Sequence, residues 1–99
     1  MPYHLDRAVI EEARKLFGPD SVAAVLRKLS ESPLPLEQSG PPPRVHIAVL
    51  WNSKGDWKTF EYELEGAQHD WRDTLVSAGL AGEDWREVLK RRGVDASGW

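Results

Sequence analysis

The chain has 99 residues, of which 40% are hydrophobic and 29% charged, and its formal net charge at pH 7 is −3. This length supports one hydrophobic core, and the composition is typical of a folded globular domain, which excludes an intrinsically disordered chain. The chain contains no cysteine, so disulfide scaffolds, thiolate metal sites and cysteine nucleophiles are excluded as well. The acidic balance disfavours a general nucleic-acid binder, which usually carries a basic excess.

The N-terminal residues do not resemble a signal or transit peptide, because they include acidic residues and no long apolar run. No apolar stretch approaches the roughly 20 residues that a membrane-spanning helix needs. We therefore expect a cytoplasmic protein without a membrane segment.

Residues 4–31 are predicted to form a pair of helices. Apolar residues from Leu5 to Phe17 recur with helical spacing, and a second such stripe follows Pro19. Gly18 is expected to end the first helix in the left-handed conformation, and Pro19 is suited to the first turn of the next helix. Because a single glycine separates them, the two helices should be antiparallel or steeply crossed.

Residues 32–43 read "SPLPLEQSGPPP" and contain five of the seven prolines. This composition predicts an extended linker that crosses between two helical parts. A polyproline ligand for a partner domain is the alternative interpretation.

Residues 44–65 fit two structures. The β-branched run "RVHIAVLW", the turn-like "NSKGD" and the alternation in "TFEYELE" are typical of a β-hairpin. The spacing of Trp57, Phe60 and Leu64 fits a helix equally well, with Asp56 at its N-cap position. Local periodicity does not decide between them.

The C-terminal part contains two further helices. In "DWRDTLVSAG", Asp70 is expected to be the N-cap and Gly79 to close the helix. In "EDWREVLKRRG", Asp84 or Glu83 is expected to begin the helix and Gly93 to follow its end. Acidic residues at the start and basic residues at the end also match the helix dipole. The tail 94–99 is expected to be frayed.

The region 44–80 resembles a group of small bacterial helical proteins of unestablished function. They share an Arg-Val start, an Ala-x-Leu core, a Gly-Asp pair and an Asp-aromatic-Arg-Asp segment with a closing Ala-Gly. The matching positions are Arg44, Val45, Ala48, Leu50, Gly55, Asp56, Ala67, Asp70, Trp71, Arg72, Asp73, Leu75, Val76, Ala78 and Gly79. The resemblance implies that residues 57–65 are helical and favours an all-helical fold, but it implies no activity.

An Asp-Trp-base triplet occurs three times at an interval of fourteen residues, beginning at Asp56, Asp70 and Asp84. Each aspartate can cap a helix while its tryptophan packs into the core, and we favour this structural interpretation. The alternative is an array of aromatic rings and cations that binds a partner, a nucleic acid or a sugar.

The sequence gives little support for a metal site, a catalytic triad or a phosphate-binding site. His4, His46 and His69 have neither the spacing of a metal site nor that of a catalytic triad, and no glycine-rich phosphate loop is present. The basic cluster 90–92 is more typical of a helix C-terminus than of a phosphate contact.

We therefore predict an all-α bundle of five or six short helices in one domain, 1–99: the helix pair 4–31, the linker 32–43, a helical cluster 44–93 and the tail. The expected function is non-catalytic and without cofactor, as a protein-interaction or scaffold module that binds a partner or forms a homodimer. A small nucleic-acid-associated regulator is the alternative, and a ligand pocket lined by Trp57 and Trp71 is a weaker one. Five tryptophans are more than one small core readily buries, so we expect some of them on the surface. The possible interaction surface comprises Trp51, Trp57, Trp71, Arg72 and Trp85.

Overall fold

The computed structural model describes residues 5–32, 42–96 and 98–99. Over these ranges it forms six helices and no strand: α1 (Arg7–Leu16), α2 (Pro19–Glu31), α4 (Pro42–Ser53), α5 (Trp57–His69), α6 (Trp71–Ala78) and α7 (Trp85–Arg91). The all-helical prediction is confirmed, and the hairpin is wrong because α4 and α5 occupy its residues. Most of the proline-rich linker, with its proposed polyproline ligand, lies outside the described residues, as does His4.

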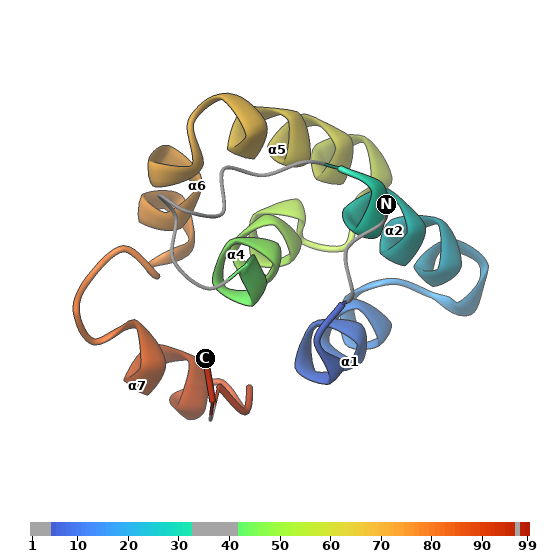
Figure 1. Cartoon of the computed structure of the whole chain (residues 1–99). Coiled ribbons are helices and arrows are strands. Elements are labelled where there is room, and N and C mark those ends of the chain that lie inside the picture. Colours follow the sequence, from blue (N-terminus) through green and yellow to red (C-terminus); the bar gives the residue numbers. More distant parts are fainter. Residues whose placement is uncertain (1–4, 33–41, 97) are drawn as a thin grey trace.

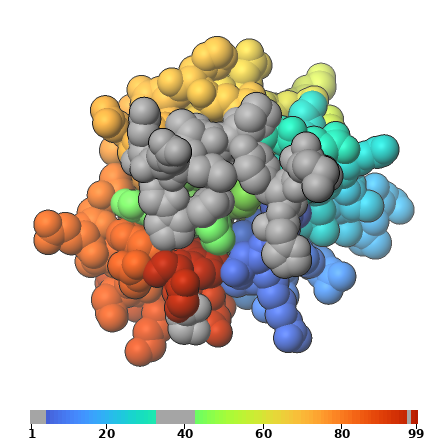
Figure 2. Space-filling view, viewed as in Figure 1, coloured from blue at the N-terminus to red at the C-terminus, as the bar shows by residue number. Residues whose placement is uncertain are grey.

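Helix α4 is the centre of the bundle. It packs against α1, α5 and α6, which lie around it in Figure 1. Seven consecutive residues, Val45 to Trp51, are buried, and only small areas of α4 (green) are visible on the face that Figure 2 shows. A helix satisfies its own backbone hydrogen bonds in such a core, whereas an isolated two-stranded hairpin is marginally stable. The β-branched run therefore reflects burial on all sides and not strand formation.

The connection between α1 and α2 differs from the prediction. Gly18 has a φ of −70° and is the extended N-cap residue of α2, not a left-handed closing residue of α1. The following Pro19 explains this conformation, because proline restricts the preceding residue to extended backbone. Phe17 ends α1, and its ring packs edge-on against Phe60 of α5 with 5.8 Å between the ring centroids.

Two other predicted helix ends are confirmed. Gly79 after α6 and Gly93 after α7 have φ values of 77° and 82°. A third left-handed turn, Lys54–Gly55, joins α4 to α5. Gly55 lies so close to the end of α1 that a Cβ atom on it would stand 2.5 Å from the main-chain oxygen of Leu16.

The tail is packed, so the expectation that it would be frayed is wrong for its described residues. Val94 and Ala96 are buried. The indole N–H of Trp99 donates to the carboxylate of Asp6 at 3.1 Å, and Arg86 donates to the main-chain oxygen of Trp99 at 2.6 Å. These bonds tie the two ends of the described chain together.

Candidate functional site

The structure places the predicted tryptophan surface mostly inside the protein. Trp51 and Trp85 are each only 7% exposed, so the prediction that they lie on an interaction surface is wrong. Trp57 and Trp71 are half-buried and pack against the core. Indole rings are large enough to bridge neighbouring helices, which is how five of them fit into a small bundle.

Trp51 joins three helices. Its indole N–H donates to a carboxylate oxygen of the buried Glu12 on α1 at 2.8 Å. The guanidinium of Arg92, just after α7, lies 3.7 Å from the centroid of its ring. These contacts stabilise the packing of α1, α4 and α7. They also engage Arg92, which is one of the three basic residues in the cluster 90–92.

Trp85 is held between two guanidinium groups. The central carbon of Arg86 lies 4.2 Å from the ring centroid, and that of Arg44 lies 4.9 Å from it. Arg44 also donates two hydrogen bonds to the main-chain oxygen of Leu80, at 2.9 and 2.7 Å. Burial, followed by the positive charge of Arg86, lowers the pKa of Arg44 below its usual value. This cluster fixes the chain between α6 and α7 onto α4.

The other two triplets have similar contacts. Arg72 stacks on Trp71 at 5.1 Å, whereas Trp57 contacts Phe60 at 5.6 Å and lies 5.9 Å from the ammonium of Lys28. The base that follows the tryptophan therefore covers its ring in two triplets, and a residue from α2 does so in the third.

The aspartates of the three triplets precede helices as predicted, but their carboxylates make different contacts. Asp56 accepts from the main-chain N–H of Thr59 at 2.9 Å and from its hydroxyl at 2.8 Å, and these bonds lower the pKa of Asp56. Asp70 accepts from the N–H of Asp73 at 3.3 Å. Asp84 makes no side-chain cap bond, which corrects its predicted role. Its carboxylate faces Arg91 at 3.8 Å instead.

The two histidines among the described residues, His46 and His69, lie in different surroundings. His46 is 2% exposed, and burial lowers its pKa to about 4, so it is neutral near pH 7. His69 is exposed at the end of α5. Among the described residues, no group of three or more histidine, aspartate or glutamate side chains could hold a metal ion.

A surface feature that the sequence analysis missed lies between α5 and α6. The two helices pack against each other and leave an open groove of about 500 Å³. The α5 side is lined by Tyr62, Glu63, Glu65, Gly66 and His69, and the α6 side by Asp70, Asp73, Thr74 and Ser77.

One exposed apolar side chain lines this groove, and a second lies on α6 outside the lining residues. Tyr62 lines it from α5 and is 76% exposed; Val76, on α6 next to the lining residue Ser77, is 64% exposed. These are the exposed large hydrophobic residues of the described chain. In the sequence, Tyr62 was part of an alternation that suggested a strand, and nothing local distinguished Val76 from a core residue.

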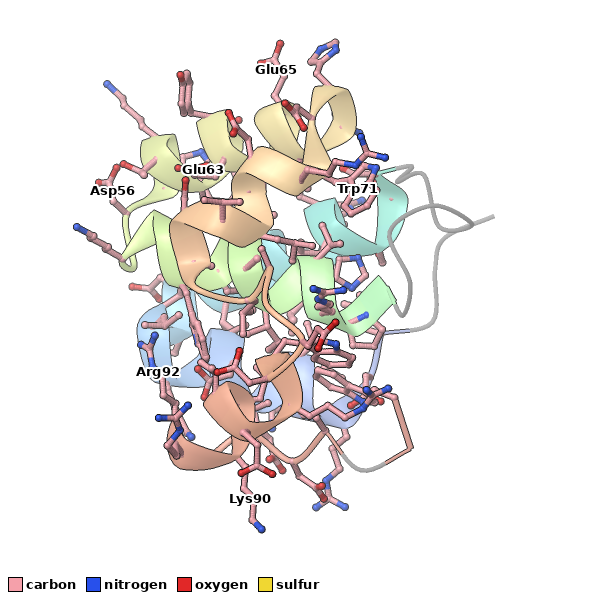
Figure 3. All side chains as sticks on the ribbon, turned by 90° about the vertical axis from the view of Figure 1, so that its left-hand side faces the viewer. Asp56, Glu63, Glu65, Trp71, Lys90 and Arg92 are labelled. Atoms are coloured by element: carbon pink, nitrogen blue, oxygen red, sulfur yellow. The ribbon has the colours of Figure 1, made fainter. Side chains whose placement is uncertain are left out.

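The excess negative charge of the chain is concentrated here. Residues 57–79 contain five carboxylates and two basic side chains, a balance of −3 that equals the net charge of the whole chain. The acidic residues are Glu61, Glu63, Glu65, Asp70 and Asp73. In Figure 3, Glu65 lies at the α5 edge of the molecule and Lys90 at the opposite, α7 edge.

Comparisons with known proteins give no relative: no family model matches, and no curated protein or solved structure matches significantly. The resemblance to the bacterial helical proteins therefore stays a prediction. None of the helices in the described ranges is both long and apolar enough to cross a bilayer.

Proposed function

We propose that this protein is a non-catalytic interaction module that binds a partner protein through the α5–α6 groove. The observation that carries the proposal is that Tyr62, a large hydrophobic residue that is 76% exposed, lines an open groove between two helices. Exposed apolar side chains rimmed by polar ones are typical of interaction sites, and tyrosine is enriched among residues that dominate binding energy.

The geometry of the groove suits a macromolecular partner better than a small molecule. Small-molecule sites are concave and mostly apolar, and they enclose most of the ligand. This groove is open and its walls carry carboxylates, hydroxyls and a histidine. An open surface of this kind gains its affinity from many contacts with a partner.

The tryptophans support the same assignment indirectly. Trp51 and Trp85 are used in packing, and the base Arg91 faces Asp84. The contribution of these residues to the stability of the fold explains why they are present. The array of aromatic rings and cations therefore gives no reason to propose a nucleic-acid regulator. We place the protein in the cytoplasm, because a chain without cysteine is suited to a reducing compartment.

Site-specific photo-crosslinking in the native cell tests the proposal. A photo-reactive amino acid in place of Tyr62 or Ser77, which line the groove from α5 and α6, should yield the same discrete protein adduct from both positions. The same amino acid in place of Arg7, whose side chain is 92% exposed on α1, is the control and should not yield that adduct. Equal crosslinking from all three positions, or none from Tyr62 and Ser77, would refute the assignment of this face.

A further inference from the structure

We infer that α7 and the described residues after it form a latch that opens as one unit while the other five helices stay folded. This C-terminal latch comprises residues 85–96, 98 and 99, and the helical body comprises α1, α2, α4, α5 and α6. Opening of the latch uncovers the ring of Trp51 on α4. The latch shares no residue with the α5–α6 groove, so it is independent of the proposed function.

The backbone of α7 is not closely packed against any other described helix. The five helices of the body pack closely against one another in pairs, and α7 takes part in none of these close pairs. Figure 1 shows α7 at the edge of the bundle, on the far side of α4 from α5. A helix in this position can separate from the bundle without disturbing the packing of the other five.

The connection before α7 can act as a hinge. Residues 81–84 are exposed and lie outside the helices α6 and α7. Leu80, directly before them, is buried, and its main-chain oxygen accepts two hydrogen bonds from Arg44 of α4 at 2.9 and 2.7 Å. The chain is therefore fixed to the body at residue 80 and free to pivot after it.

Side chains hold the latch closed. Three contacts join it to the body, and each of them involves an indole ring: Arg92 with Trp51, Trp85 with Arg44, and Trp99 with Asp6. The buried hydrophobic residues of the latch are few: Trp85, Leu89, Val94 and Ala96. Because the free energy of a local opening rises with the apolar surface that it exposes, the latch opens at a lower free energy than the whole bundle unfolds.

The opening is all-or-none because α7 is too short to persist alone. It has seven residues, and isolated helices of fewer than about 12 residues are marginal in water. Once detached, α7 loses its helical structure and gains conformational entropy. The contacts of Arg92 and Trp99 with the body are therefore lost together.

Opening changes the surface of the body at Trp51. In the closed form this ring is buried, and the guanidinium of Arg92 lies over it at 3.7 Å. The indole N–H donates to Glu12 of α1, and this bond lies within the body, so it persists when the latch opens. The latch therefore controls whether a large apolar side chain of the body is accessible to solvent.

Thiol labelling tests the opening, because the chain contains no cysteine of its own. Val94→Cys places a buried thiol in the latch, and Val49→Cys, the matched control, places one in α4 of the body. At low urea, where global unfolding is rare, the thiol reagent DTNB should modify Val94→Cys at least about tenfold faster than Val49→Cys. The rate should depend weakly on urea for Val94→Cys and strongly for Val49→Cys, since only the second thiol needs the whole bundle to unfold.

Two results would overturn the inference. Equal rates with equal urea dependence for the two cysteines would mean that the latch opens only when the whole protein unfolds. A rate for Val94→Cys as high as that for Ser77→Cys, which is at an exposed position of α6, would mean that the latch is not closed at all.

The contact between Arg92 and Trp51 is tested in the same assay. Arg92→Ala should raise the labelling rate of Val94→Cys about threefold or more and leave that of Val49→Cys unchanged, because a cation over an indole ring stabilises only the closed latch. Arg72→Ala is the matched control, since Arg72 covers Trp71 within α6, and it should change neither rate. An equal effect of Arg92→Ala on both cysteines would contradict the latch.

A bulky label traps the open form and tests the exposure of Trp51. Fluorescein maleimide attached to Val94→Cys leaves no room for the latch to close. Hydroxyl-radical footprinting should then show at least about threefold more oxidation of Trp51 than in the unlabelled variant, with little change at Trp71, and circular dichroism should retain most of the helical signal. Unchanged oxidation of Trp51, or loss of most of the helical signal, would refute the inference.

Discussion

Gly55, in the turn between α4 and α5, combines a φ of +79° with an approach to Leu16 that leaves no room for a side chain. Gly55→Ala should lower the free energy of unfolding by about 2 kcal/mol or more, because left-handed strain adds to a contact with rigid backbone. Gly79→Ala is the control: φ is +77° there, but nothing lies within 4 Å of the added carbon, so we expect about 1 kcal/mol. Urea denaturation measures both, and equal losses would show that the Leu16 contact has no energetic effect.

His46 on α4 makes stability depend on pH. Burial lowers its pKa to about 4 in the folded protein, compared with about 6.5 in an unfolded chain. Between these values the unfolded state binds more protons, so stability is complete above pH 6.5 and falls as the pH drops towards 4. The difference corresponds to about 3 kcal/mol.

The variant His46→Gln isolates this effect, because glutamine has no charge to gain in this range. Urea denaturation at pH 7, 5.5 and 4.5 should show a clear loss of stability in the parent protein and a smaller loss in His46→Gln. His69→Gln controls for the removal of a histidine as such, since His69 is exposed. A parent protein with the same stability at all three pH values would contradict the burial argument.

At the scale of helices, the Asp-Trp-base triplets predict where a helix begins. They do not predict whether the side chain of the aspartate accepts a hydrogen bond from the first turn. Asp70→Ala should cost about 1 kcal/mol, because the N–H of Asp73 loses its acceptor. Asp84→Ala should change stability by less than about 0.5 kcal/mol, since that side chain only faces the exposed Arg91. Chemical denaturation of the two variants tests this difference, and an equal cost for both would restore the cap role predicted for Asp84.

The helices whose position could be predicted are those with local signals. Asp70 and Gly79 mark both ends of α6 because a cap and a left-handed closing residue act within a few residues of the chain. Helix α4 has no apolar period, since it is buried on all sides, and its residues therefore fit a strand as well as a helix. Only the packing of α1, α5 and α6 around it resolves the ambiguity.

The candidate site could not be predicted for a related reason. The groove exists because α5 crosses α6, and the exposure of Tyr62 and Val76 depends on which face of each helix meets α4. Two partners of the tryptophans are equally non-local: Arg92 covers Trp51 and Arg44 covers Trp85, each from 41 residues away in the sequence. Composition suggested an interaction surface that includes Trp51 and Trp85, but the structure buries both residues.

For the molecule as a whole, Asp6 links the beginning and the end of the described chain. One of its carboxylate oxygens caps α1 by accepting from the N–H of Ala8 at 2.9 Å, and the other accepts from the indole of Trp99 at 3.1 Å. Because 93 residues separate the two partners, this bond closes a loop around the whole bundle. The cap alone would account for an aspartate at this position, so the bond to Trp99 needs its own test.

A double-mutant cycle provides that test. Trp99→Phe keeps an aromatic ring but removes the donor, and should cost about 1 kcal/mol. Asp6→Ala removes the cap as well and should cost about 2 kcal/mol. The double variant should lose no more than Asp6→Ala does, which leaves a coupling energy of about 1 kcal/mol between the two positions. If the two losses simply add in urea denaturation, the indole and the carboxylate do not interact in solution, and the tail is held by the packing of Val94 and Ala96 and by the bond from Arg86 to the main-chain oxygen of Trp99.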